Sequence, residues 1–113
     1  MQAYRRGPYV FKELAVPREK IAEFCRRWKI TEFALFGSVL RKDFRPDSDI
    51  DVLVTFARDV QWSLLDHVEM QDDLKDIFGR NVDLISRRGI ERSRNRVRRK
   101  EILDTAEVIY AAA

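Results

Sequence analysis

Three aspartates occupy positions where strands are expected, and their spacing suits the binding of a metal ion. Asp49 and Asp51 lie two residues apart, just before the apolar run 52–54. Residues two apart on a strand share a face, so these carboxylates would project together, with Cα atoms roughly 6.6 Å apart. Carboxylates placed in this way repel each other unless a cation lies between them. Asp83 lies inside a third strand-like pattern, where an unpaired acidic side chain is costly to bury and requires an explanation.

A Gly-Ser turn precedes the acidic pair. Gly37 and Ser38 follow the apolar run 33–36, which is typical of a buried strand. At a strand end, glycine lets backbone N–H groups approach a phosphate, and serine can cap the next helix and donate its hydroxyl. A Gly-Ser pair alone is more often an ordinary turn. Together with the three aspartates it predicts donors for a triphosphate beside ligands for two magnesium ions, which can clamp the attacking and leaving oxygens of an in-line displacement.

Each of these acidic residues also has an interpretation that involves no chemistry. Asp49 and Asp51 could be solvated loop acids, although the surrounding pattern makes this the weaker interpretation. Asp83 could lie at a strand edge and pair with Arg80 or Arg87. These alternatives predict different neighbours for the carboxylates, so the structure can separate them.

The first helix is expected to start at Pro17, because proline suits the first helical turn. The apolar residues that follow have the i, i+3, i+4, i+7 spacing of one buried stripe: Ile21, Phe24, Cys25 and Trp28. Cys25 is therefore expected to pack in the core, since no basic residue is clearly placed to lower its pKa. A single cysteine excludes an internal disulfide and fits a reducing, cytoplasmic setting.

A second helix is expected between Ser63 and Gly79. Ser63 with Asp66 three residues later has the form of a capping box, and Gly79 suits a helix C-terminus. Five apolar residues are predicted to cover one broad face of this helix: Leu64, Leu65, Val68, Leu74 and Phe78. His67 has no second histidine, cysteine or suitably spaced carboxylate to complete a ligand set, so we expect it to have no catalytic role.

The last third of the chain carries a strand and then a strongly basic segment. Residues 81–86 have the alternating pattern of a strand. Residues 87–100 contain eight basic residues and one acidic residue, in a chain whose formal net charge is +3. Their arginines would encircle a helix, so a solvated helix and a patch that attracts ATP, an acidic partner or nucleic acid are both open. No aromatic residue interleaves them, which argues against a platform for stacked single-stranded bases.

Length and composition fit one small domain. With 113 residues, of which 45% are hydrophobic and 36% charged, the chain can bury a single core, and no apolar run approaches the ~18 residues of a membrane span. Residues 1–16 lack periodicity and are treated as an N-terminal arm that need not be ordered, whereas 17–113 form the domain. A final strand over 107–110 is slightly favoured over a continuous terminal helix. We expect no targeting sequence, and a compact α/β unit.

The acidic and Gly-Ser segments together resemble the signature of the minimal nucleotidyltransferases of the DNA polymerase β superfamily. The residues that carry the resemblance are Gly37, Ser38, Arg41, Asp43, Pro46, Ser48, Asp49 and Asp51. The order of expected elements from about Pro17 to Tyr110 also matches that family, which implies a small single-domain α/β fold with a mixed β-sheet flanked by helices. Lys42 and Phe44 stand where many members carry small residues, and 1–16 match nothing in the motif. None of these departures removes a carboxylate.

The resemblance implies a role for each residue of the candidate site. Asp49, Asp51 and Asp83 would be the catalytic and metal-binding carboxylates, and Asp83 would position or deprotonate the attacking hydroxyl. The nucleotide-binding residues would be Gly37 and Ser38, which hold the phosphates, supported by Arg41 and Ser48. Two Mg²⁺ ions would be the cofactors, and ATP the substrate.

Many small members of this family resemble the antitoxin half of a toxin–antitoxin pair whose partner is an all-helical HEPN ribonuclease. This implies transfer of AMP from ATP to a hydroxyl of the toxin, with tyrosine as the expected acceptor, within a cytoplasmic hetero-oligomer. Two alternatives stay open: an antitoxin that binds and masks its toxin without chemistry, against which the intact carboxylates weigh, and transfer to a small molecule or an RNA end. Nucleic-acid binding is not favoured, and no membrane association is expected.

Overall fold

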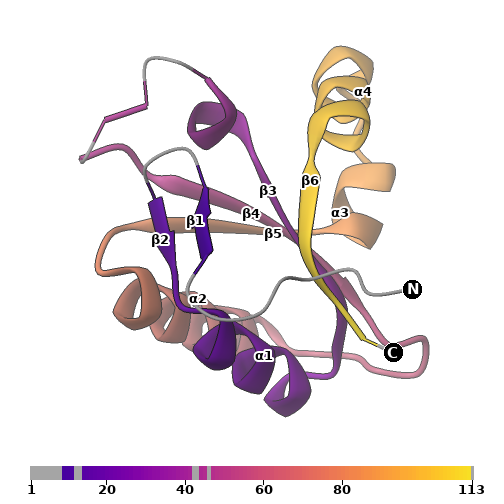
Figure 1. Cartoon of the computed structure of the whole chain (residues 1–113). Helices are drawn as coiled ribbons and strands as arrows, with labels where there is room; N and C mark the ends of the chain where they lie inside the picture. Colours follow the sequence, from indigo (N-terminus) through magenta and orange to yellow (C-terminus); the bar gives the residue numbers. More distant parts are fainter. Residues whose placement is uncertain (1–8, 12–13, 42–43, 46, 113) are drawn as a thin grey trace.

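A four-stranded mixed sheet forms the centre of the molecule (Figure 1). The computed structural model describes residues 9–11, 14–41, 44–45 and 47–112. The elements in chain order are β1 (Tyr9–Phe11), β2 (Leu14–Val16), α1 (Arg18–Arg27), β3 (Ile30–Phe36), the 3₁₀ turn η1 (Gly37–Leu40), β4 (Ile50–Phe56), α2 (Leu64–Phe78), β5 (Val82–Ser86), α3 (Arg87–Glu91), α4 (Arg96–Thr105) and β6 (Glu107–Ala111).

The strand order in the central sheet is β5-β4-β3-β6. Strand β3 pairs antiparallel with both β4 and β6, whereas β4 and β5 are parallel. The parallel pair is connected through α2, as a parallel connection requires a crossover. The predicted mixed α/β fold is therefore confirmed.

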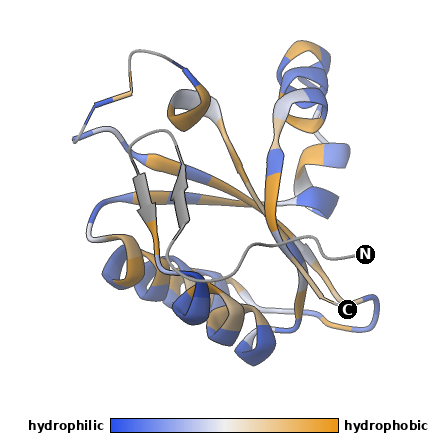
Figure 2. Ribbon diagram, in the orientation of Figure 1, coloured by the Kyte–Doolittle hydropathy of each residue, from blue (hydrophilic) through white to orange (hydrophobic). Residues whose placement is uncertain are grey.

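Helices cover both faces of this sheet because its strands alternate in which side chains they send to each face. One face carries residues such as Phe33, Leu35 and Val52, which form the larger core with α1 and α2. The other face carries Phe36 and Leu53, which pack with buried residues of α3 and α4. Figure 1 shows the two helix pairs on separate sides of the sheet, and Figure 2 shows apolar residues along the strands with hydrophilic ones on the outer helix surfaces.

Helix α1 matches its sequence prediction. Its buried residues include Ile21, Phe24 and Cys25, and Trp28 is buried just after the helix. Burial raises the pKa of the Cys25 thiol far above its ordinary range, with the nearby Arg26 charge opposing this weakly. A thiol held protonated in this way is inert, so the prediction that Cys25 is a core residue is confirmed.

Helix α2 begins and ends as predicted but turns a different face to the core. Ser63 and Asp66 form the capping box, and Gly79 terminates the helix in the left-handed conformation. The buried residues are Met70 and Leu74, whereas Leu64, Leu65 and Val68 are exposed. At ~100° per residue, these three lie ~120 to 160° around the helix from Met70. The predicted apolar face was therefore wrong for its first three members.

The two ends of the chain add further strands. The C-terminal residues form β6 at the edge of the central sheet, so the prediction of a final strand is confirmed. The basic segment contains two helices, α3 and α4, separated at residues 92–95. Strands β1 and β2 form a separate antiparallel hairpin inside the stretch 1–16, while residues 1–8 and 12–13 lie outside the described part of the chain. The division of the chain at residue 17 stays a prediction. Among the described residues, no helix is long and apolar enough to cross a bilayer.

Candidate active site

The three aspartates lie at one end of the sheet, on two neighbouring parallel strands. Asp51 of β4 is directly opposite Asp83 of β5 in the pairing register. Paired residues on parallel strands point to the same face, and the strands are about 4.8 Å apart, so the two side chains lie side by side. Asp49 immediately precedes β4. Two strands that the sequence separates by a whole helix therefore bring Asp51 and Asp83 together, whereas Asp49 is not part of this pair.

The Gly-Ser turn closes over Asp51 from the other neighbouring strand. Phe36, the last residue of β3, pairs with Asp51, and Gly37 follows with a φ of +74°. A Cβ atom at Gly37 would overlap Oδ2 of Asp51 and lie 3.0 Å from its Cγ. Glycine is thus required here for two reasons, the left-handed backbone and the close approach of the carboxylate.

Ser38 ties the turn to both members of the acidic pair. Its backbone N–H donates a hydrogen bond to the Asp51 carboxylate. Its hydroxyl donates to the carbonyl oxygen of Asp49 at 3.2 Å. The hydroxyl therefore holds the loop ahead of β4 in place, which is a structural contact that the sequence did not indicate.

The electrostatics of the site centre on Asp51. Burial of this half-buried carboxyl raises its pKa, and the charges of Asp83 and Asp49 raise it further. The hydrogen bond from Ser38 and the positive charge of Arg98 act in the opposite direction. The net shift is upward, so the surroundings disfavour the negative charge of Asp51.

These carboxylates suit a cation whose remaining ligands are supplied by phosphate oxygens and water. Within the described residues, no three Asp, Glu, His or Cys side chains are close enough to form a metal site from the protein alone. Mg²⁺ is commonly held by one or two carboxylates while phosphate oxygens and water complete its coordination. Asp51 and Asp83, side by side with Asp49 adjacent, provide hard oxygen ligands of the right kind, and Asp51 carries a charge that a cation would relieve.

Arg80 holds the loop that leads into the acidic pair. Its guanidinium donates to the carbonyl oxygens of Arg45 and Ser48, each at 3.1 Å, and lies 5.0 Å from the centre of the Phe44 ring. The Ser48 hydroxyl accepts from the Arg45 N–H at 3.0 Å. The side chain of Ser48 therefore shapes this loop. Asp43 and Pro46 lie outside the described residues.

The arginines that could have explained Asp83 are engaged elsewhere. Arg80 donates to the loop carbonyls, and Arg87 lies 3.9 Å from carboxylate oxygens of both Glu32 and Glu91. No ion pair to Asp83 is found in the described parts of the chain, and the side chain is exposed on the edge strand. The interpretation of Asp83 as half of a structural ion pair is therefore not supported.

Helix α4 brings one basic residue to the carboxylates. A cavity of about 340 Å³ lies between the Gly37 turn and α4, and Arg98 lines it. The charge of this residue lowers the pKa of Asp51. Sequence reasoning missed Arg98, because it was one of five arginines expected to encircle a helix and nothing local distinguishes it from the others. Arg41, a predicted nucleotide-binding residue, is exposed just after η1.

Comparison with known proteins points to one family. Residues 18–109 match the family described as "Nucleotidyltransferase domain". Protein adenylyltransferase MntA of Thermococcus cleftensis is 33% identical over 69 residues, which cover 61% of this chain and 68% of MntA. A solved structure assigned to the minimal nucleotidyltransferases is 36% identical, with a TM-score of 0.60, over 79% of this chain and 85% of that one.

One chain of a solved complex has the same fold as this protein. It contains tri-AMPylated Shewanella oneidensis HEPN toxin with an MNT antitoxin. The match has a TM-score of 0.57 and 23% identity, and it covers 83% of this chain and 69% of that one. At this identity the likeness is one of fold.

Proposed function

The chain belongs to the minimal nucleotidyltransferase family, and from this membership we propose that it transfers AMP from ATP to a hydroxyl of a partner HEPN toxin, acting as its antitoxin. Two relatives support the proposal: a 33% identical protein named as a protein adenylyltransferase, and the AMPylated toxin held by an antitoxin of this fold. The observation that carries it is the pairing of Asp51 with Asp83 beneath the Gly37 turn. Tyrosine is the acceptor residue that we propose.

The residues divide into those that hold phosphates and those that hold cations. Gly37 leaves room beside Asp51 because it has no side chain, and Ser38 fixes the turn, so the turn can lie against a phosphate. Asp49, Asp51 and Asp83 would hold Mg²⁺. When bound, the metal would neutralise the charge of the triphosphate and of the leaving pyrophosphate. Arg41 and Ser48 are proposed to support nucleotide binding.

We propose that Asp83 is the base that accepts the proton of the acceptor hydroxyl. The acceptor oxygen forms a bond to the α-phosphorus of ATP while the bond from that phosphorus to the bridging oxygen breaks. Pyrophosphate leaves with the electron pair, and the hydroxyl proton passes to the Asp83 carboxylate. Asp83 is exposed and has no ion pair within the described residues, so an incoming hydroxyl can reach it.

The Asp83→Asn variant tests this assignment, because it keeps the size of the side chain but removes the base. In complex with the HEPN partner, we expect AMP transfer, measured by the intact mass of the toxin, to fall ~100- to 10,000-fold. Nucleotide binding and partner binding should largely persist. Asp72→Asn, an equivalent change on the exposed surface of α2, should have no effect.

Protection of cells from the toxin then separates catalysis from masking. If the protein acts by transfer, the Asp83→Asn protein should bind the toxin but no longer protect. A variant that protects as well as the wild type would show that the toxin is masked, and the enzymatic account of protection would have to be given up.

A further inference from the structure

Arg80 lies in the connection between α2 and β5, three residues before Asp83. Its side chain is partly buried and reaches the loop that ends at Asp49. One nitrogen of the guanidinium, Nη1, donates to two main-chain carbonyl oxygens of this loop, those of Arg45 and Ser48, each at 3.1 Å. Arg80 therefore connects the segment that leads into the Asp83 strand with the residue immediately before Asp49.

The guanidinium of Arg80 is itself held in place by an aromatic ring. It lies 5.0 Å from the centre of the Phe44 ring, and Phe44 is partly buried against the larger core. A cation over an aromatic face is attracted by the negative charge of that face. This contact gives a structural reason for Phe44, which stands where many members of the family carry a small residue.

The position of Asp49 depends on this loop. Asp51 and Asp83 lie within paired strands, whereas Asp49 precedes β4 and is exposed. The carbonyl oxygen of Asp49 accepts a hydrogen bond from the Ser38 hydroxyl at 3.2 Å, and the carbonyl oxygen just before it accepts from Arg80 at 3.1 Å. Asp49 is therefore held by contacts to the main chain on either side of it rather than by a strand ladder.

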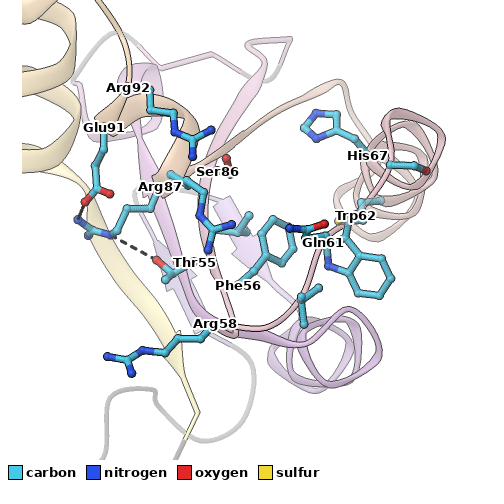
Figure 3. Close-up of a pocket in the computed structure, with 15 residues that line it drawn as sticks. Thr55, Phe56, Arg58, Gln61, Trp62, His67, Ser86, Arg87, Glu91 and Arg92 are labelled. Carbon is cyan, nitrogen blue, oxygen red and sulfur yellow. Dashed lines mark hydrogen bonds and ion pairs between the residues drawn. The ribbon is translucent and has the colours of Figure 1, made fainter.

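Arg80 acts on the main chain and not on the carboxylates. In the described parts of the chain, no ion pair joins Arg80 to an acidic side chain. Arg87, at the other end of β5, donates instead to the Thr55 hydroxyl and lies 3.9 Å from a carboxylate oxygen of Glu91 (Figure 3). Of these two arginines beside β5, Arg80 is thus the one that contacts the aspartate end of the sheet.

From these contacts we infer that Arg80 is a positioning residue for the transfer reaction: by holding the loop, it keeps Asp49 where its carboxylate binds a cation together with Asp51. The inference rests on the proposed function, since it concerns the same cation site. A guanidinium suits this task because its planar fork presents several donors in fixed directions. Residues that orient a metal ligand without touching the metal change metal affinity or activity about 10- to 100-fold when they are replaced.

Binding of a fluorescent ATP analogue, measured by anisotropy while Mg²⁺ is titrated, tests the inference. In Arg80→Gln, we expect the Mg²⁺ concentration that gives half-maximal nucleotide binding to rise about tenfold, because Asp49 is less well placed. At saturating Mg²⁺ the nucleotide affinity should approach that of the wild type. An unchanged Mg²⁺ requirement in Arg80→Gln would overturn the inference.

Arg80→Lys separates the contacts of the side chain from its charge. The lysine Nζ corresponds to the arginine Cζ, so it falls one bond short of the two carbonyl oxygens although the positive charge remains. We therefore expect Arg80→Lys to need nearly as much Mg²⁺ as Arg80→Gln. Full recovery in the lysine variant would mean that charge is responsible, which contradicts the inference.

A double-mutant cycle with Asp49 separates positioning from a general loss of structure. If Arg80 acts through Asp49, Arg80→Gln should raise the Mg²⁺ requirement no more than about twofold in an Asp49→Asn background. Equal effects in both backgrounds would contradict the inference. Arg99→Gln is the matched control and should leave the Mg²⁺ requirement unchanged. Arg99 also donates to a main-chain carbonyl oxygen at 3.1 Å, that of Ser93, but in the basic segment.

Phe44→Leu provides a second variant of the same contact. It removes the ring beside the guanidinium and keeps an apolar side chain against the core, so it should raise the Mg²⁺ requirement about two- to fivefold. Circular dichroism shows whether each variant is folded. Should Arg80→Gln fail to fold, Phe44→Leu decides, and an unchanged Mg²⁺ requirement in that variant would refute the role of Arg80.

The wild type distinguishes a failure of this inference from a failure of the proposed function. Nucleotide binding by the wild type that needs no Mg²⁺ would contradict the proposed cation site, and the role of Arg80 with it. Nucleotide binding that needs Mg²⁺ in the wild type, with the same Mg²⁺ requirement in the folded Arg80 variants, would refute the role of Arg80 alone.

Discussion

Replacement of Gly37 by alanine would test the geometry of the carboxylate site most directly. The new methyl group would occupy the space now taken by Oδ2 of Asp51. The carboxylate would have to move away, and the hydrogen bond that it accepts from the Ser38 N–H would be lost or weakened. The substitution therefore combines backbone strain with the displacement of a functional side chain.

The cost of the backbone strain and the cost of displacing the carboxylate can be estimated separately. A non-glycine residue in the left-handed region costs roughly 1–2 kcal/mol. Loss of a hydrogen bond to a charged group costs about 1.5–3 kcal/mol, and the lower end applies here because Asp51 is only half-buried. We therefore expect Gly37→Ala to lower the free energy of unfolding by about 2–4 kcal/mol, a large part of the ~5–15 kcal/mol that stabilises a typical domain.

Gly79→Ala is a matched control that carries only the first cost. Gly79 has a φ of +70°, close to that of Gly37, but a Cβ there would meet nothing within 4 Å. Its replacement should cost only the roughly 1–2 kcal/mol of backbone strain. A second control is Gly37→Ala in an Asp51→Ala background, where the remaining Cβ of residue 51 would be 3.4 Å away, an ordinary contact. In that background the two glycine substitutions should cost the same.

Urea denaturation of the wild type, the single variants and the double variant gives the coupling energy between positions 37 and 51. We expect a coupling of about 1–2 kcal/mol, together with loss of ATP binding in Gly37→Ala but not in Gly79→Ala. If Gly37→Ala were as mild as Gly79→Ala, or if Asp51→Ala gave no relief, the close approach of the turn to the carboxylate would be refuted.

Further measurements test the site and the core. ATP binding in titration calorimetry should require a divalent cation, because Asp49 and Asp51 otherwise repel the phosphates, and tight binding in excess chelator would contradict this. The Asp49→Asn, Asp51→Asn protein should fold but lose transfer. The raised pKa of Asp51 means that wild-type stability falls as pH rises from the ordinary aspartate range of ~4 through that pKa, so the variant should lack this decline in urea denaturation, and identical pH profiles would oppose the assignment. Arg98→Gln should weaken binding of ATP with magnesium about five- to tenfold while Arg94→Gln leaves it unchanged, and equal effects would exclude a specific role. Cys25 should react with a thiol reagent only as the protein unfolds, and rapid labelling of the native protein would contradict its burial.

The three candidate carboxylates could be singled out from the sequence because this depends on short-range periodicity. Asp49 and Asp51 share a strand face by the two-residue repeat, and Asp83 stood out as an acid in an otherwise strand-like pattern. What the pattern could not supply was the register between β4 and β5, which places Asp51 directly opposite Asp83. The residues of the site could be recognised from local sequence patterns, but their alignment depends on the tertiary structure.

The error in α2 has a specific physical cause. Its N-terminal half contains three large aliphatic residues that the sequence alone suggested as core, because burial is the usual position of such residues. The helix, however, can turn only one stripe to the sheet, and Met70 and Leu74 occupy it. Leu64 and Leu65 were left on the outer surface. A sequence can show that a helix has apolar residues on more than one face. Which of these faces is buried depends on the element that the helix packs against.

The role of Arg98 was equally beyond the sequence, and it explains how the site balances its charge. Burial of Asp51 and the charges of two other carboxylates oppose its ionisation, while within the described residues the Ser38 N–H and Arg98 favour it. The opposing influences are larger, since the pKa of Asp51 stays raised. A single arginine supplied by a helix on the same face of the sheet is thus enough to moderate the repulsion but not to cancel it. Carboxylates with a purely structural role are commonly paired with a basic side chain, as Glu69 and Asp73 are paired with Arg27 on the outer surface. Because no residue in the described parts of the chain neutralises the remaining negative charge, we expect its neutralisation to contribute to the binding of a cation and a triphosphate.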